Sequence, residues 1–227
     1  MKTKLAAALA ALAVAVAARA ESPRRGSLEL GAGMYRPDVD SEFTTKPGPY
    51  EQLFGTGRGW AFRLGASRAV YTGVGALEVG LRTGFFQDDG DQLLPDGTRS
   101  ADKTSLRIIP TSLTLTYRFD WLATRYNIPL AFYARGALER YNWWVTDQSD
   151  WAEKGATNGW SVTGGAAFLL DFLDRSLARE LDEDAGVNDT WLFFDVTKTK
   201  VDDFGSSKSW DLSDEDLSLS GGLMFVF

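Results

Sequence analysis

The sequence predicts an all-β protein, an eight-stranded antiparallel transmembrane β-barrel with long extracellular loops and one short periplasmic helix. Three observations support this prediction. They are an export signal at the N-terminus, eight segments that alternate between apolar and polar residues, and a last strand that ends in an aromatic residue. After the first twenty residues, no apolar run approaches the roughly 20 residues of a membrane-spanning helix. A membrane location would therefore depend on strands.

The N-terminus has the composition of a signal peptide. Two lysines precede an apolar run of Ala, Leu and Val at residues 5–18, and Ala18 and Ala20 are small residues at the positions that signal peptidase reads. The run is too short for a membrane anchor, which needs roughly 20 apolar residues. We therefore expect a signal peptide at residues 1–20, a barrel domain at residues 21–227, and export to the outer membrane of a Gram-negative bacterium.

Composition excludes several classes of function. The formal net charge is −7, and loss of the signal peptide, which holds three basic residues and no acidic one, would make it −10. A chain this acidic is a poor partner for nucleic acid, whose phosphates require a basic face. The chain has no Cys and no His, so disulfides, a lipoprotein anchor and the commonest general base are all missing. We expect no enzymatic activity, no catalytic residue, no metal site and no cofactor.

Eight segments alternate with a period of two, the periodicity of a β-strand. In the third segment, for example, Leu77, Val79 and Leu81 alternate with Glu78 and Arg82. Each segment has about the length of a membrane-crossing strand, roughly 9–11 residues. The predicted strands are residues 27–35, 59–70, 74–86, 104–119, 130–144, 159–170, 190–199 and 216–227.

The composition of the polar face indicates which side of the strands faces inward. That face consists mostly of Gly, Ser and Thr with a few Arg, Glu and Asp, which suits a narrow and crowded lumen. On the apolar face, aromatic residues occur near the strand ends, as in the aromatic girdles of outer-membrane barrels at the membrane interfaces. These residues are Trp60, Phe85, Tyr117, Phe119, Trp144 and Trp160. A soluble secreted barrel of the lipocalin type, with the apolar face inside, is the alternative.

Connection lengths also alternate. The links after the odd-numbered strands are long and rich in Asp, Gly and Pro, whereas the link at residues 72–73 is a tight turn. Outer-membrane barrels place long loops outside and short turns in the periplasm. Residues 44–49 are interpreted as plain loop, and residues 120–129 form a periplasmic link of modest length.

One periplasmic link, residues 172–189, is long enough to hold a helix. Three leucines recur in it every four residues, the spacing of one helical face. They are Leu173, Leu177 and Leu181. Asp171 or Asp174 would cap the start of this helix and Gly186 its end. We expect it to cover the periplasmic mouth of the barrel.

The C-terminus carries the strongest single motif. Apolar residues occupy Leu217, Leu219, Leu223 and Phe225, and the chain ends in Phe227. This pattern is similar to the signal that the outer-membrane barrel-assembly machinery reads. In hydrocarbon the last strand must pair with the first, because an open edge would leave backbone groups without hydrogen bonds.

Three stretches resemble a myxobacterial family of small outer-membrane β-barrel proteins, and the resemblance extends over nearly the whole mature chain. They are residues 34–42 (MYRPDVDSE), 116–120 (TYRFD) and 181–188 (LDEDAGVN). The family pattern often carries a His after residue 188, where this chain has Asp189. The resemblance implies fold and location, but it implies no metal or proton site here and no established activity.

Charged residues on the predicted inner face form a balanced set. The acids are Glu78, Glu139 and Asp195, and the bases are Arg63, Arg82, Arg118 and Arg135. A carboxylate pair could act as in glycosidases, but the near balance of charge favours structural ion pairs. Arg82 and Glu78, like Arg135 and Glu139, are four residues apart on one strand, about 13 Å. We therefore expect their ion-pair partners on neighbouring strands.

Acidic residues in the predicted loops form two clusters. The members are Asp88, Asp89, Asp91 and Asp96, and then Asp202, Asp203, Asp211, Asp214, Glu215 and Asp216. The ligand spacing of an EF-hand is missing, so we interpret both clusters as solvated surface. Weak divalent-ion bridging to lipopolysaccharide phosphates is a second interpretation.

These observations favour a monomeric outer-membrane barrel with a membrane-structural or surface-interaction role. Its expected partners are outer-membrane lipid, lipopolysaccharide and the barrel-assembly machinery, with no nucleic acid. The alternatives are a narrow channel or carrier for small hydrophobic molecules, and a soluble secreted lipocalin-like ligand-binding barrel.

Overall fold

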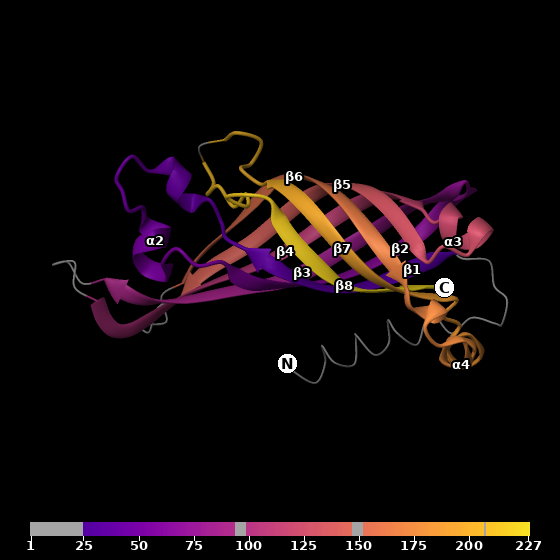
Figure 1. Ribbon diagram of the computed structural model, residues 1–227. Helices are drawn as coiled ribbons and strands as arrows, with labels where there is room; N and C mark the ends of the chain where they lie inside the picture. The colour runs from indigo at the N-terminus through magenta and orange to yellow at the C-terminus, as the bar shows by residue number, and fades with distance from the viewer. Residues whose placement is uncertain (1–24, 94–98, 147–151, 207) are drawn as a thin grey trace.

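The computed structural model describes residues 25–93, 99–146, 152–206 and 208–227. The predicted signal peptide and Asp96 lie outside these residues. Eight antiparallel strands form one closed barrel in which each strand pairs with its neighbours in the sequence and β8 pairs with β1 (Figure 1). The predicted fold is therefore confirmed.

The strands are connected by short helices and loops at both ends. The strands are β1 (Gly26–Tyr35), β2 (Gly59–Gly73), β3 (Gly75–Leu93), β4 (Arg99–Phe119), β5 (Leu130–Thr146), β6 (Ala152–Leu169), β7 (Asp189–Lys200) and β8 (Ser218–Val226). The helices are η1 (Val39–Glu42), α2 (Pro49–Phe54), α3 (Trp121–Tyr126), η2 (Leu170–Phe172) and α4 (Arg175–Ala185). None of the helices in the described residues is long and apolar enough to cross a membrane.

The predicted alternation of faces is confirmed. On β3, Leu81 is 62 % exposed on the outside of the barrel, whereas Glu78 is 2 % exposed inside it. The same contrast holds on β5 between Leu138 and Glu139. The outer wall of the barrel is therefore a band of apolar side chains, and the inner wall carries the Gly, Ser, Thr and paired charges.

The pairing register sets the width of the barrel. From Arg118 on β4, consecutive backbone pairs lead through β5, β6, β7, β8, β1, β2 and β3 and return to β4 at Ile108, ten residues from the start. With a rise of about 3.3 Å per residue and a strand spacing of about 4.7 Å, this stagger gives a strand tilt of about 40° and a Cα radius of about 8 Å. Side chains fill an interior of that width.

Several strands are longer than predicted, most of all β3, β4 and β6. β3 and β4 continue as a two-stranded ribbon beyond the apolar band, and Asp88, Asp89 and Asp91 lie on this ribbon and not in a loop. β5 and β6 also extend, to Thr146 and from Ala152. The prediction placed the strand ends where apolar alternation ends, but backbone pairing can continue through polar residues.

The predicted helix near the chain termini is confirmed as α4. Asp174 accepts a hydrogen bond from the backbone N–H of Ser176 at 2.9 Å, and Gly186 follows the helix with a φ of +68°. Leu173 lies before the helix and is 70 % exposed, so it does not belong to the helical face that its spacing predicted. The other helices were not predicted. Residues 44–49 are loop except Pro49, which begins α2.

Both described chain ends lie at one end of the barrel, which we call the terminal end. There the backbone N–H of Phe227 donates to the carbonyl oxygen of Gly26 at 2.9 Å, which extends the β1–β8 pairing. α3 and α4 are at the same end (Figure 1). The opposite end of the barrel, which we call the loop end, carries η1, α2 and the β7–β8 loop. β8 thus closes the barrel, as the C-terminal motif predicted.

The seam between β8 and β1 allows only small residues at some positions. A Cβ atom on Gly222 would lie 2.0 Å from the carbonyl oxygen of Leu30, whereas a Cβ atom on Gly136 of β5 meets no atom within 4 Å. We expect Gly222→Val to prevent closure and Gly136→Val to fold normally. Folded yield in detergent, measured as the heat-modifiable fraction on a gel, distinguishes them. Equal folded yields would show that the seam tolerates a side chain.

Candidate functional site

The lumen is the region where the sequence predicted charged residues, and it has three layers. At the loop end, aromatic and aliphatic side chains fill it. They are Tyr35, Phe86, Leu106, Ile108, Tyr141 and Trp143, with Val39, Tyr50, Val201 and Leu212 from the adjoining loops. At the terminal end a second apolar layer contains Ala131, Tyr133, Ala167, Trp191, Phe193, Met224 and Val226. A polar layer lies between these two.

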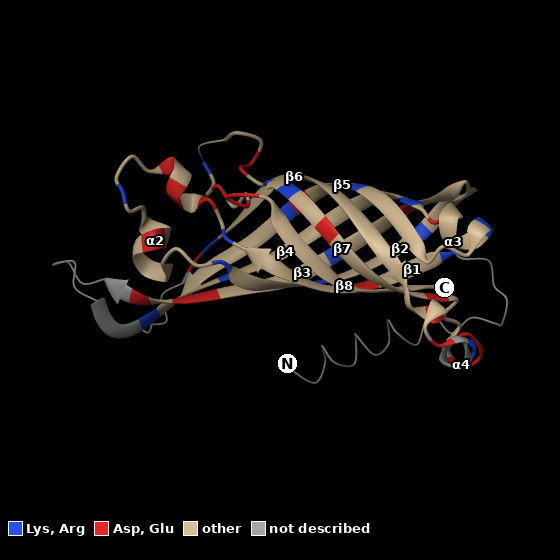
Figure 2. Ribbon diagram, in the orientation of Figure 1, with Lys and Arg blue, Asp and Glu red and all other residues tan. Residues whose placement is uncertain are grey.

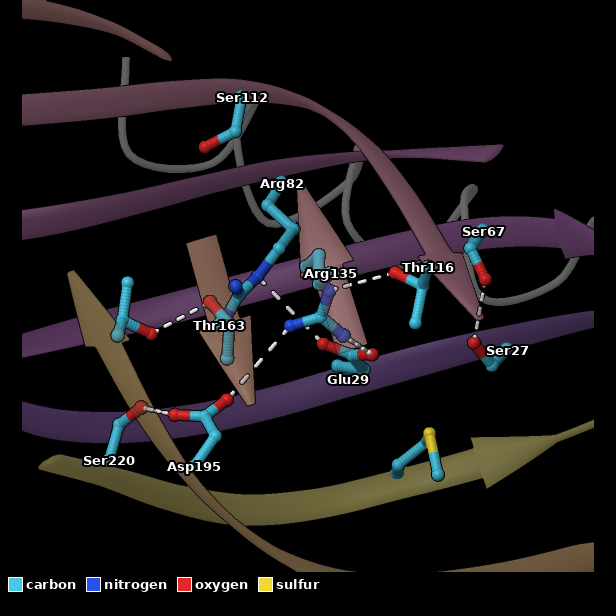
Figure 3. Close-up of polar contacts among 12 residues, drawn as sticks. Ser27, Glu29, Ser67, Arg82, Ser112, Thr116, Arg135, Thr163, Asp195 and Ser220 are labelled. Atoms are coloured by element: carbon cyan, nitrogen blue, oxygen red, sulfur yellow. Dashed lines mark hydrogen bonds and ion pairs between the residues drawn. The ribbon is translucent and has the colours of Figure 1, made fainter. Parts of the chain in front are cut away.

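Glu29 on β1 is at the centre of the polar layer (Figure 3). One of its carboxylate oxygens accepts a hydrogen bond from Nη2 of Arg135, and the other lies 3.8 Å from Nε of Arg82. Nη1 of Arg135 is 4.0 Å from Oδ2 of Asp195, and its Nε donates to Thr116 at 2.9 Å. Side chains from strands β1, β3, β5 and β7 therefore meet in one network.

A second ion pair lies toward the terminal end. Nη1 of Arg118 is 2.9 Å from Oε1 of Glu78, and its Nε is 3.4 Å from Oδ2 of Asp120. The hydroxyl groups of Ser27 and Ser67 donate to the other oxygen of Glu78. Glu78 thus finds its partner Arg118 on the neighbouring strand β4, as predicted. For Arg82 and Arg135 the prediction was wrong, because their common partner Glu29 reaches them across the lumen from β1, which is adjacent to neither β3 nor β5.

Glu139 and Arg63 are held by neutral groups. Glu139 accepts hydrogen bonds from the hydroxyl groups of Ser112 and Ser161, and Arg63 donates to the hydroxyl of Tyr141 at 3.1 Å. Glu29 adds a fourth inward acid to the three that the sequence analysis named. Its position on the polar face of the first predicted strand is the signal that could have identified it.

One small cavity lies inside the lumen, with a volume of about 30 Å³. Its lining includes Arg63, Arg82, Glu139, Phe193 and Ser220. A single water molecule needs roughly 10–15 Å³ of such space, so this cavity has room for only a few waters. Within the described residues, the lumen is therefore filled by its own side chains.

Two loop segments fold over the loop end, and we call residues 36–58 and 208–217 the loop cover. The backbone N–H of Asp38 donates to the carbonyl of Ser213 at 3.0 Å, and the hydroxyl of Tyr35 donates to the carbonyl of Leu212 at 2.6 Å. Trp210 stacks on Trp143 of β5 with ring centroids 4.2 Å apart. The loop cover is thus anchored to the apolar layer below it.

Two acidic residues of the loop cover, Asp211 and Asp214, are buried, which corrects the prediction of a solvated surface for them. Asp214 is 1 % exposed and pairs with Arg58 at 2.5 Å, and Asp211 is 9 % exposed with Oδ2 3.5 Å from Nζ of Lys200. Glu215 pairs with Arg36. Asp211 and Asp214 are buried because the two loop segments pack against each other, a tertiary contact that composition does not reveal.

The remaining acids of the two predicted clusters have polar partners as well. Asp88 accepts from the hydroxyl of Tyr50 at 2.6 Å. The others pair with Gln87 and Ser105 (Asp89), Lys103 (Asp91), Lys200 (Asp202), Asn158 (Asp203) and Arg58 (Asp216). Among the described residues, no group of three or more acids is arranged to hold a metal ion.

Comparisons with known proteins identify the fold. No protein family model matches the sequence, and no curated protein matches it. The chain is similar to the crystal structure of Neisserial surface protein A, with 12 % identity, a TM-score of 0.51, and coverage of 91 % of this chain and 98 % of that one. This likeness supports the same fold, a closed eight-stranded antiparallel β-barrel.

Two further solved structures are more distant. The N-terminal β-barrel domain of Pseudomonas aeruginosa OprF has 13 % identity and a TM-score of 0.44, with coverage of 90 % of this chain and 100 % of that one. Ail of Yersinia pestis has 9 % identity and a TM-score of 0.42, with coverage of 89 % and 97 %.

Glu29 is expected to be the most sensitive lumen position. Glu29→Ala leaves Arg82 without its carboxylate and Arg135 with only the more distant Asp195, so we expect a loss of about 3 kcal/mol in the free energy of unfolding, the lower end of the range for breaking a buried ion pair. Glu153→Ala, at an exposed position on β6, is the matched control. Urea unfolding in detergent measures both. Equal stability of the two variants would contradict a structural role for Glu29.

The loop cover is expected to tighten in mild acid. Burial raises the pKa of the Asp38, Glu42 and Asp214 carboxyls, and the nearby Arg58 opposes this rise at Asp214. As the pH falls through the raised pKa toward the ordinary value of about 4, the folded cover binds more protons than the unfolded one, so its stability increases. Hydrogen exchange of residues 36–43 and 211–215, corrected for intrinsic rates, should slow between pH 7 and pH 5. Faster exchange at pH 5 would mean that acid opens the cover.

Proposed function

We propose that this chain is an exported, non-enzymatic outer-membrane barrel of a Gram-negative bacterium with a membrane-structural or surface-interaction role. The observation that carries this proposal is the combination of an apolar outer wall with a closed, filled lumen. Leu81, Leu138 and Phe194 are more than half exposed on that wall, and only hydrocarbon would cover so much apolar surface favourably.

The contents of the lumen favour this role over that of a channel. The ion pairs of Glu29 lie between two apolar layers, and the Glu78–Arg118 pair lies beside Tyr133 and Met224 of the layer at the terminal end. The cavity inside the lumen has room for only a few waters. The inward acids are engaged by arginines and serines, and the chain has no His to act as a base. The ribbon of β3 and β4, which projects beyond the apolar band, offers a surface for contacts outside the cell.

Cell fractionation and electrical recording together test the proposal. The processed protein should appear in the outer-membrane fraction, and in planar bilayers it should give no steady conductance. Arg82→Ala is the comparison variant. It removes a side chain beside the cavity and is expected to give brief conducting events. Steady conductance by the unmodified protein would favour a narrow channel, and recovery in a soluble fraction without detergent would favour a secreted ligand-binding barrel.

A further inference from the structure

Two basic side chains interrupt the apolar outer wall at its edge toward the loop end. On β5, the outward row continues from Leu138 to Arg140, and both residues are exposed. On β7, the outward row continues from Val196 to Lys198, which is also exposed. Neither cation points into the lumen, because the adjacent residues Glu139 and Thr199 are the buried ones.

The barrel geometry brings these two cations to nearly the same level. Arg140 pairs across to Asn158 of β6, and Lys198 pairs across to Val162 of the same strand. Arg140 and Lys198 are therefore offset by four residues along β6. Because the strands are tilted, a row of paired residues rises toward the loop end by slightly more than one residue at each step from β5 to β6 and from β6 to β7. This rise reduces the offset, so the two residues lie within about two residues of each other along the barrel axis. Their Cα atoms are about 16 Å apart, from two strand spacings and four residues of offset.

An aromatic side chain lies between the two cations. Trp160 of β6 is 42 % exposed on the outer wall and is opposite Leu138 on one side and Lys200 on the other. Tryptophan prefers the level of lipid headgroups, where its ring contacts acyl chains and its N–H remains near polar groups. This position therefore marks the height at which the wall passes from acyl chains to headgroups.

The protein itself leaves the two charges largely uncompensated. Nη1 of Arg140 donates to the side chain of Asn158 at 2.9 Å, and within the described part of the chain neither Arg140 nor Lys198 forms an ion pair. Other basic residues at this end do pair with carboxylates, as Lys200 does with Asp202 at 3.1 Å. A guanidinium has five N–H donors, and among the residues that the structure describes only Asn158 accepts a hydrogen bond from Arg140.

We infer that Arg140, Trp160 and Lys198 form a binding surface for a phosphorylated lipid headgroup in the outer leaflet. Arginine binds phosphate oxygens through its planar fork, and lysine binds them as a point charge. The acyl chains would lie below, against Leu138, Val162 and Phe194. This inference deepens the proposed function and rests on it, since a lipid contact requires the barrel to be in a membrane.

The acidic loops strengthen the case for this position. The chain has a net charge of −7, and acidic residues are numerous on the loops at this end of the barrel (Figure 2). Arg36 and Arg58 of these loops are already paired with carboxylates, so they are not available to an anionic headgroup. Arg140 and Lys198, which project sideways from the wall, offer it a positively charged position.

Native mass spectrometry of the full-length processed protein, released from nanodiscs of phosphatidylcholine with a small fraction of lipid A, tests the inference. The unmodified protein should retain lipid A in preference to phosphatidylcholine. Arg140→Ala/Lys198→Ala should bind lipid A about 30-fold more weakly, from a factor of about five for each basic side chain near an anionic surface. Lys154→Ala, an exposed cation farther along β6 beyond the apolar band, is the matched control and should bind as the unmodified protein does.

The outcomes separate this inference from the proposed function. Binding by the double variant equal to that of the unmodified protein would overturn the lipid site while leaving a membrane barrel in place. Failure of the unmodified protein to enter nanodiscs would overturn both. If the double variant folds poorly, judged by heat-modifiable mobility, two other samples test the same electrostatic contact. One is Lys198→Gln alone. The other is the unmodified protein in about 1 M salt, where the screening length falls to about 3 Å. Unchanged lipid A binding in both would also overturn the site.

Discussion

Closure of the backbone hydrogen-bond ladder is the constraint on which the rest of this structure depends. β8 pairs with β1 along Gly31, Ala32 and Gly33, so every strand in the wall has a partner on both sides. In an apolar solvent an unpaired edge would cost several kcal/mol per backbone group. Eight strands with a stagger of ten residues then fix the tilt and the radius, and these decide how much the interior can contain.

The narrow interior explains the composition of the inner wall. Charged side chains there cannot be separated by bulk water, so each needs a partner within a few ångströms. Glu29 serves Arg82 and Arg135 together, and Glu78 binds Arg118 while two serines complete its hydrogen bonds. Such buried pairs add little net stability, but removing one partner is costly. The lumen is thus a packed core with polar contents, closed at both ends by apolar layers.

At the loop end, the unpaired edge of β6 is also supplied with hydrogen-bond partners. Beyond Trp160, β6 has no partner strand in β7, and the β7–β8 loop takes that place. The backbone N–H of Asp203 donates to the carbonyl of Asn158 at 2.8 Å, and the hydroxyl of Ser209 donates to the carbonyl of Ala156 at 3.3 Å. An uncovered edge would be a template for pairing with another chain. The β7–β8 loop therefore protects the edge as well as the mouth.

The sequence by itself determined the strand count, the order of pairing and the face of each side chain, because a period of two in apolar residues is a local property. It placed Arg82 and Arg135 inside, but it did not identify Glu29 as their partner. Their meeting depends on the stagger of ten residues, which brings β1, β3 and β5 to one level only after the barrel closes. The extended ribbon of β3 and β4 and the burial of Asp214 were likewise decided by tertiary structure. Backbone pairing and loop packing join residues far apart in the chain, and no local pattern records them.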